Sequence, residues 1–331
     1  MKLRVPAEWE SHSGCITAWP HLENEWQHQL VASQIAILEL VKLLAPDEPV
    51  TVLVKDEVTK SKVEEFLPAE TKALVMPYGD IWLRDTGPIG LFANDKIEMR
   101  RFSFNGWGNR FLFEGDETLA ERLSDKFEFS VKHCEINLEG GALDWNGAGT
   151  VLTTRQCALN TNRNPGKRET DIELALREHF GVEKVIWFAQ GLLGDHTDGH
   201  IDNICRFVSP SAVVMMKPGQ ETDPNREILE NLLSSVRGMR NAGGEPLDVV
   251  EIPSPGLVPT QDGSPLPASY LNFYISNSTV VVPTFGVPND EKALQVIQSL
   301  FPERRVEGLD AKALLFGGGT FHCVTQQIPA S

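Results

Sequence analysis

The sequence of 331 residues lacks the features of a membrane protein and of a secreted, disulfide-bonded protein. It has no apolar run of about 18 residues, the length that a membrane-spanning helix requires. Its start, MKLRVPAEWESHSG, has no apolar stretch of the signal-peptide type. Its five cysteines, at positions 15, 134, 157, 205 and 323, are odd in number and form no CxxC pair. We therefore expect reduced thiols in a cytoplasmic protein, with neither a disulfide framework nor a zinc ribbon.

Positive charge is also scarce. The sequence has 46 Asp and Glu residues against 30 Lys and Arg residues, and its formal net charge is −16. This balance disfavours nucleic acids and anionic membranes as partners. It is compatible with a small cationic substrate, although an excess of acid can also serve solubility alone. A homodimer is an assembly that the sequence leaves open.

A repeated order of predicted elements runs along the chain. Two β-rich arms around a short polar turn, the pattern of a hairpin, occur at 87–102 (with the turn at Asn94-Asp95), 141–154, 203–216 and 271–285. A stretch of helical periodicity follows each hairpin, at 116–127, 168–180, 222–236 and 288–301. A third strand comes next, most clearly at 183–188 and 247–252, and the N-terminal part adds a helix at 26–44 and a strand at 50–54. About five such units fit the length, which predicts one α/β domain over residues 1–331 with its units around an axis. An ordinary α/β sheet with antiparallel hairpins is the alternative.

Polar residues gather at one recurring place, between the third strand of a unit and the next hairpin. The clusters are YGDIWLRDTGP (78–88), NLEGGAL (137–143), LGDHTDGHIDN (193–203) and GGGTFHC (317–323). In a ring of units these connections would converge on the axis, and connections on a rigid scaffold often carry catalytic residues. We therefore expect one site built from all four clusters.

The third cluster invites a metal interpretation. The candidate ligands are His196, His200, Asp195, Asp198 and Asp202, with His322 and Cys323 elsewhere. Nitrogen and sulfur ligands suit zinc. No HExxH or comparable spacing occurs, however, so we predict no metal and no cofactor.

A cysteine nucleophile is the stronger hypothesis, because it needs a thiolate, a base and an orienting acid. Cys323, His200 and Glu139 supply these three types. His200 could carry protons to a leaving group and from a water, and Glu139 could fix its tautomer. A lone cysteine is nevertheless often a small buried hydrophobic residue, and a lone histidine is often structural.

Two aspartates, Asp85 and Asp202, complete the set. Carboxylates match the fork of N–H donors on a guanidinium group. The combination predicts covalent attack on a guanidinium carbon held by two aspartates. For Asp85, an ion pair with Arg84 or a role in the turn before Gly87 is the alternative.

Taken together, the motifs resemble those of the agmatine deiminase family, part of the guanidine-modifying (pentein) superfamily, over nearly the whole chain. The matching segments, in order, are VPAEWESHSGCITAWP, GDIWLRDTGPI, FNGWGNRF, NLEGGAL, TTRQCALNTNRNP, DGHIDN and GGGTFHCVTQQ. The resemblance implies a five-bladed pseudo-symmetric α/β propeller of ββαβ-type units around a central active site. It also implies roles: Cys323 as nucleophile, His200 as catalytic histidine, Glu139 as its partner, Asp85 and Asp202 as guanidinium ligands, and Trp82 as a pocket wall.

One position departs from the family pattern. Family members often carry an acid four residues before the catalytic histidine, where this chain has His196. We expect this side chain near the substrate, so the change weakens the case for agmatine itself.

The function that we expect is hydrolytic deimination of a small guanidine, with agmatine giving N-carbamoylputrescine and ammonia through a covalent thiouronium on Cys323. Alternative substrates are arginine, peptidyl arginine or a guanidine with a different tail. Other classes remain open: an amidinotransferase of the same fold, a non-catalytic binder of guanidines or polyamines, and a zinc hydrolase.

Overall fold

Five small sheets make up the strand content of the computed structural model, which describes residues 2–94 and 96–331. Four of these sheets contain an antiparallel hairpin whose second strand pairs in parallel with a third strand. In the fifth sheet the antiparallel pair is β17 with β2, which no turn connects, and β2 pairs in parallel with β3. The predicted hairpin–helix–strand unit is therefore present in four sheets. Asn94 of the first predicted turn has a φ of +57°, a value that asparagine tolerates well, and Asp95 lies outside the described residues.

The strands are as follows, sheet by sheet. The first sheet holds β1 (Leu3–Arg4), β5 (Ile89–Ala93), β6 (Lys96–Ser103) and β7 (Val131–Asn137). The second holds β8 (Asp144–Trp145), β9 (Thr150–Thr154) and β10 (Lys184–Phe188). The third holds β11 (Cys205–Ser209), β12 (Ala212–Lys217) and β13 (Asp248–Pro253). The fourth holds β14 (Tyr274–Ile275), β15 (Thr279–Thr284) and β16 (Arg305–Asp310). The fifth holds β17 (Gln326–Pro329), β2 (His12–Ala18), β3 (Val50–Val54) and β4 (Lys72–Val75).

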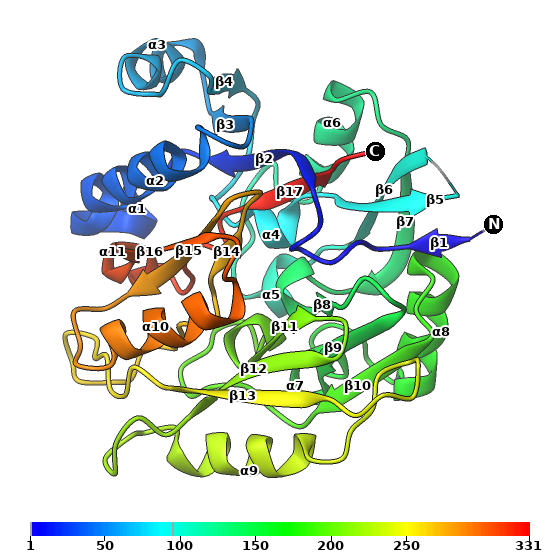
Figure 1. Ribbon diagram of the computed structural model, residues 1–331. Helices are drawn as coiled ribbons and strands as arrows, with labels where there is room; N and C mark the ends of the chain where they lie inside the picture. The colour runs from blue at the N-terminus through cyan, green and yellow to red at the C-terminus, as the bar shows by residue number, and fades with distance from the viewer. Residues whose placement is uncertain (1, 95) are drawn as a thin grey trace.

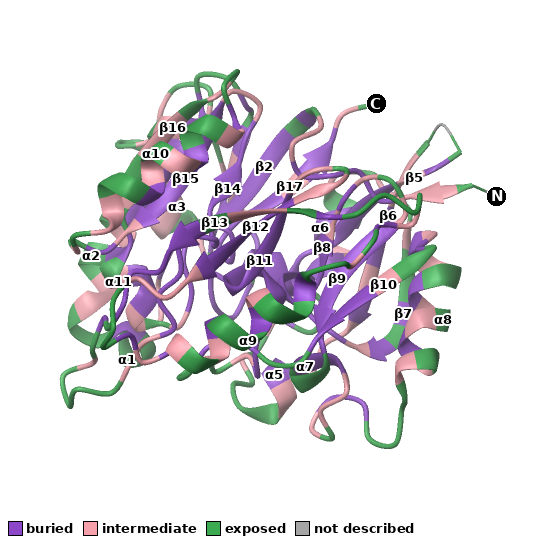
Figure 2. Cartoon of the chain, turned by 60° about the horizontal axis from the view of Figure 1, so that its bottom comes forward, coloured by how far each residue is buried: buried purple, intermediate pink, exposed green. Residues whose placement is uncertain are grey.

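One long helix joins the second strand of each unit to its third strand. These helices are α2 (Leu30–Leu44), α6 (Leu119–Lys126), α8 (Glu169–Phe180), α9 (Arg226–Val236) and α10 (Asp290–Leu300). In α9 the buried side chains are Leu229, Leu232 and Val236, whose spacing of three and four residues gives one apolar face. The helices lie at the periphery and the strands inside them (Figure 1), and the strands are largely buried while the helices expose their outer faces (Figure 2).

The fifth unit is completed by the two ends of the chain. Strand β17 pairs antiparallel with β2, with Gln326 opposite Ile16 (Figure 1). The sequence pattern did not predict this pairing, because no local turn signal connects strands so far apart along the chain. Its consequence is that the residues just before β17, including Cys323, are held against the N-terminal part of the molecule.

Shorter elements fill the connections. They are α1 (Glu23–Trp26), α3 (Glu57–Glu64), α4 (Leu83–Thr86), α5 (Gly106–Asn109), α7 (Arg155–Ala158), α11 (Lys312–Phe316) and 3-10 turns at Gln27–Gln29, Gly140–Ala142 and Ile201–Asn203. Among the residues described here, no helix is both long and apolar enough to cross a membrane. The predicted mixed α/β class is confirmed, whereas a propeller arrangement of the five units stays a prediction.

Candidate active site

All four predicted polar clusters lie in connections that lead toward the hairpin of a following unit, and their key side chains are buried. Three of these side chains meet around the backbone of Gly141. A Cβ atom at this position would lie 2.7 Å from His200 Nδ1, 3.0 Å from Asp202 Oδ2 and 3.0 Å from Asp85 Oδ1. Only glycine fits such a close approach. The structure therefore brings together residues that are more than 100 positions apart in the chain.

His200 is fully buried and is anchored from one side. Its Nε2 lies 3.2 Å from Glu139 Oε2, whereas Nδ1 has no hydrogen-bond partner among the described residues and lies 3.9 Å from Asp85 Oδ2. Burial acts to lower the pKa of His200, but Asp85, Cys157 and Glu139 outweigh it and hold the pKa well above its usual value. The ring is therefore an imidazolium whose Nδ1–H is free to serve a ligand.

Glu139 is held in turn by a buried arginine. Arg163 Nε donates to both carboxylate oxygens, at 2.8 and 2.9 Å, while its Nη1 donates to Asp198 Oδ2 at 2.7 Å. Burial opposes ionisation of Glu139, yet Arg163 and His200 keep its pKa below the usual value. Arg163 lies in the segment NTNRNP, to which the sequence reasoning assigned no role, because nothing local shows that this arginine reaches Glu139.

Asp85 is oriented by two donors. Its Oδ1 accepts from the Gly141 backbone N–H at 2.9 Å, and its Oδ2 accepts from Trp107 Nε1 at 2.8 Å. Trp107 has a left-handed backbone with a φ of +53°, a strained conformation of the kind found at functional sites. Burial raises the pKa of Asp85. The alternative partner, Arg84, forms an ion pair with Glu8 at 3.4 Å instead.

The two carboxylate oxygens of Asp202 differ in their hydrogen bonding. Its Oδ2 accepts from His322 Nδ1 at 2.7 Å, and its Oδ1 is buried with no hydrogen-bond partner among the described residues. Burial acts to raise the pKa of Asp202, but the contact with His322 keeps it below the usual value. An ionised oxygen that is buried without a partner is costly. Such an oxygen suits a cationic ligand.

Cys323 lies beside these carboxylates and is nearly buried, with 6% of its surface exposed. Its Sγ lies 3.8 Å from Asp202 Oδ2 and accepts from Asn272 Nδ2 at 3.1 Å. Burial, Asp202 and Asp85 raise the pKa of this thiol well above its usual value. At neutral pH the free protein therefore holds a thiol at this position, not a thiolate.

The glycine run before Cys323 is required by close packing. A Cβ at Gly319 would lie 2.7 Å from the Trp82 ring and 3.0 Å from Cys323 Sγ, and one at Gly317 would lie 2.7 Å from Trp26. The run thus lets the backbone lie directly against the sulfur and two indole rings. It leaves space for a ligand that a larger side chain would fill.

Asn272 is a site residue that the sequence reasoning missed. Its side-chain oxygen accepts from the backbone N–H groups of Thr320 at 3.2 Å and Cys323 at 3.3 Å, and its Nδ2 donates to the sulfur. Asn272 lies in the connection between β13 and β14, the same place in its unit as the four predicted clusters. That position was the available signal, but this connection lacks the dense charge that marked the others.

A cavity of about 140 Å³ leads to this group of residues. Asp85 and Cys323 are buried polar residues in its lining, Trp82 forms part of its wall, and His196 is an exposed residue that also lines it. The remaining wall is mainly aromatic, from Trp26, Trp107, Phe111, Phe113 and Phe316, with Glu25, Asp80 and Thr197 as polar neighbours. The structure thus places both Trp82 and His196 in the lining of this cavity.

The described residues contain one group with metal-ligand proximity: Glu139, Cys157 and His200, whose ligand atoms lie within 4.8 Å of one another. It differs from the set considered from the sequence. Arg163 donates twice to Glu139 and the His200 imidazolium lies 3.2 Å from it, so a metal cation beside this carboxylate would be repelled. The absence of a metal stays a prediction.

Comparison with known proteins places this site in context. The family model of the Porphyromonas-type peptidyl-arginine deiminases matches residues 4–329. An agmatine deiminase of Ectopseudomonas mendocina is 34% identical, with 98% of this chain and 95% of that protein covered. The structure of an Enterococcus faecalis agmatine deiminase superimposes with a TM-score of 0.93 at 28% identity, covering 99% of this chain and 96% of the other. A Cys→Ser variant of a C. jejuni agmatine deiminase with substrate bound gives a TM-score of 0.92 at 27% identity, covering 99% and 97%. By its family match and by these relatives, the chain belongs to the Porphyromonas-type peptidyl-arginine deiminase family.

Proposed function

We propose that the protein hydrolyses the guanidinium group of a small cation, and that agmatine is converted to N-carbamoylputrescine and ammonia. The observation that carries this proposal is the buried Asp202 carboxylate: its Oδ2 lies 3.8 Å from the Cys323 sulfur, and its Oδ1 has no hydrogen-bond partner among the described residues. Asp85 approaches the same glycine, Gly141, as Asp202 does. A guanidinium ion offers the charge and the N–H donors that these two carboxylates require. The family match and the agmatine deiminases among the relatives support the same chemistry.

Binding of the substrate would activate the nucleophile. The free thiol is kept protonated by burial and by the charges of Asp202 and Asp85. A guanidinium held between these aspartates neutralises that charge and adds a cation beside the sulfur. The pKa of Cys323 then falls and its proton passes to solvent, from which it returns when the product leaves. The thiolate that forms is stabilised by the Asn272 amide at 3.1 Å.

The covalent step uses His200 as a proton donor. The Cys323 thiolate attacks the guanidinium carbon and forms a C–S bond, and the C–N bond to one nitrogen then breaks. The imidazolium Nδ1–H, which has no hydrogen-bond partner among the described residues, gives its proton to the departing ammonia. The product on the enzyme is an S-alkylthiouronium cation, and His200 is left neutral.

Hydrolysis restores the enzyme. Neutral His200 takes a proton from a water molecule whose oxygen bonds to the thiouronium carbon. The C–S bond then breaks, and the thiolate leaves with the bonding electrons. The remaining proton joins ammonia as ammonium, so that guanidinium and water are converted to a substituted urea and ammonium. Glu139, fixed by Arg163, stabilises the imidazolium in both halves of the reaction.

The tail of the substrate is the less defined part of the proposal. Aromatic rings form most of the cavity wall, and His196 also lines it, at the position where the resemblance to the agmatine deiminase family leads us to expect an acid. Arginine, peptidyl arginine or a guanidine with a longer or neutral tail are the alternatives within the class. A non-catalytic guanidine or polyamine binder would need neither the thiol nor the Glu139–His200 pair that the site contains.

A panel of guanidines tests the proposal. Agmatine, arginine, blocked peptidyl arginine and longer amino-guanidines are assayed for ammonia release and for the urea product. We expect turnover of at least one small guanidine, unaffected by EDTA and dialysis. Transfer of the amidino group to an added amine would instead indicate an amidinotransferase, and loss of activity on chelation with recovery by zinc would indicate a zinc hydrolase.

A further inference from the structure

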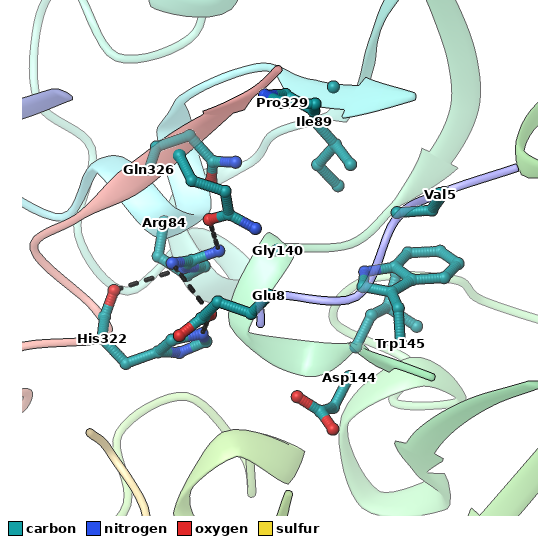
Figure 3. Close-up of a pocket in the computed structure, with 13 residues that line it drawn as sticks. Val5, Glu8, Arg84, Ile89, Gly140, Asp144, Trp145, His322, Gln326 and Pro329 are labelled. Carbon is teal, nitrogen blue, oxygen red and sulfur yellow. Dashed lines mark hydrogen bonds and ion pairs between the residues drawn. The ribbon is translucent and has the colours of Figure 1, made fainter. Parts of the chain in front are cut away.

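Behind Asp202 lies a buried histidine held between two carboxylates. His322 Nδ1 is 2.7 Å from Asp202 Oδ2, and Nε2 is 2.9 Å from Glu8 Oε2. All three side chains are buried, and Figure 3 shows Glu8, Arg84 and His322 meeting at the edge of a second cavity. Glu8 comes from the N-terminal segment and His322 from the C-terminal one, so this contact joins the two ends of the chain.

The geometry requires two N–H donors on the ring. A neutral imidazole has one N–H and one lone pair. With either neutral tautomer, a ring lone pair would face a carboxylate oxygen at hydrogen-bond distance in a buried place. An imidazolium satisfies both contacts, each of them charge-assisted.

The charges around the ring lead to the same conclusion. Glu8 forms ion pairs with Arg206 at 3.1 Å and Arg84 at 3.4 Å, and its Oε1 accepts from the Ile275 backbone at 2.7 Å. Asp144 pairs with Arg206 at 2.6 Å. The three buried carboxylates of this group, Glu8, Asp144 and Asp202, thus face two arginines. The group is neutral only when His322 carries the third positive charge, and unpaired buried charge is strongly unfavourable.

Two cavities lie near this arrangement, and Glu8 and His322 line only the second of them. Cys323 and Asp85 line the larger cavity, whereas Glu8, Arg84 and His322 line the second one, of about 30 Å³. That volume is enough for a water molecule. In the second cavity Arg84 Nη2 and Gln326 Oε1 have no hydrogen-bond partner among the described residues, so water there would have partners. The Glu8 end is therefore reached without passing the substrate.

We propose that His322 is a positioning residue, an imidazolium that donates one ring N–H to Asp202 Oδ2 and the other to Glu8, and so leaves Asp202 Oδ1 available to the substrate. The role in turnover rests on the proposed deiminase function. The protonation state does not, because it is a property of the free protein. These two parts are therefore tested separately.

The first measurement is ring nitrogen NMR on the full-length protein without substrate. The His322 signal is assigned by its loss in His322→Gln. In the wild type at neutral pH both ring nitrogens should carry a proton, one facing each carboxylate. In Glu8→Gln one of the two flanking charges is gone, so one ring nitrogen should lose its proton at the same pH.

The matched control is Glu48→Gln. Glu48 is also buried and also contacts a histidine, with Oε1 3.0 Å from His12 Nδ1, but neither residue touches the proposed site. This variant should leave the His322 signal and the pH profile of turnover as in the wild type. A change in the control equal to that in Glu8→Gln would show a general effect of losing a buried carboxylate.

The second measurement is the pH profile of His322→Gln with a guanidine that the wild type turns over. Glutamine can still donate to Asp202 but carries no charge. The pKa of Asp202 is lowered by His322, so without that charge Asp202 takes up a proton at higher pH. We expect kcat/KM to fall at least about tenfold, mainly through KM, with a loss that grows as the pH is lowered.

The outcomes are distinguishable. A His322 ring with only one protonated nitrogen in the wild type overturns the inference, as does a loss in His322→Gln that is the same at every pH. If the wild type turns over no guanidine while both ring nitrogens of His322 carry protons, the proposed function and the role of His322 in turnover are wrong. The assignment of His322 as an imidazolium is then still correct. If His322→Gln does not fold, Glu8→Gln decides the protonation state and its pH profile replaces that of His322→Gln.

Discussion

Replacing Asp202 by asparagine should make the Cys323 thiol more reactive while it weakens or abolishes turnover. The substitution keeps the size of the side chain and removes a negative charge whose Oδ2 lies 3.8 Å from the sulfur. That charge is one of the causes that hold the pKa of Cys323 well above its usual value, after burial itself. The thiol gains reactivity because the thiolate, not the thiol, is the nucleophile.

The magnitude follows from the distance. Two unit charges about 4 Å apart interact with about 4 kcal/mol at an effective dielectric constant of about 20. Because each 1.36 kcal/mol or so changes an equilibrium tenfold, the thiolate fraction below the pKa should rise by roughly 10²–10³. We expect the second-order rate of alkylation by iodoacetamide near pH 8 to rise at least tenfold.

The assay follows alkylation of residue 323 by mass spectrometry across a range of pH. The pH dependence separates ionisation from access, since access alone scales the rate equally at every pH. Glu48→Gln serves as the control for loss of a buried carboxylate and should alkylate like the wild type. Alkylation of Asp202→Asn that is unchanged or slower, at all pH values, would refute the electrostatic reasoning about this site.

The remaining predictions concern one residue each. Asn272→Ala removes a hydrogen bond to the thiolate. A hydrogen bond to a charged acceptor is worth about 1.5–3 kcal/mol, so kcat/KM for the guanidine substrate should drop at least roughly tenfold. An unchanged value would show that the 3.1 Å contact has no role in turnover. Glu139→Gln removes one cause of the raised pKa of His200. Because the imidazolium is present below this pKa and lost above it, the alkaline limb of the pH profile of turnover should move to lower pH. A limb that stays in place would contradict the assignment of Glu139 as the partner of His200. His196→Glu adds a negative charge to the cavity lining and should raise kcat/KM for agmatine relative to other guanidines, with a gain that shrinks at high salt. If the wild type already prefers agmatine strongly and the variant leaves that preference unaltered, His196 does not set specificity.

Elements with a local signal were predicted well. The four hairpins and the long helices follow alternation and helical periodicity, and the structure confirms each of them. Strand β17 was not predicted as the partner of β2, because that pairing joins residues more than 300 positions apart and leaves no local trace. The same limit applies to Arg163 and Glu8, whose partners come from distant connections.

In the candidate site, too, residues with a local sequence signal were predicted and residues defined by long-range packing were not. Cys323, His200, Asp85 and Asp202 stood out because charged and nucleophilic residues clustered at one repeated position, and the structure brings them together. Asn272 occupies that position in the unit without a charged neighbour, and so it gave no signal. The doubly held ring of His322 could not be predicted either, since its two carboxylates are defined only by the packing of the chain ends.

The central claim is that Cys323 forms a covalent bond to the guanidinium carbon. The most direct test is to mix the wild-type protein with an excess of a guanidine that it turns over, quench with acid within one turnover, and map the added mass. The account predicts the mass of a thiouronium on residue 323, and no such adduct and almost no turnover in a folded Cys323→Ser variant. Substantial turnover by the serine variant would contradict the account, as would a wild-type enzyme that is active but carries no adduct at this residue.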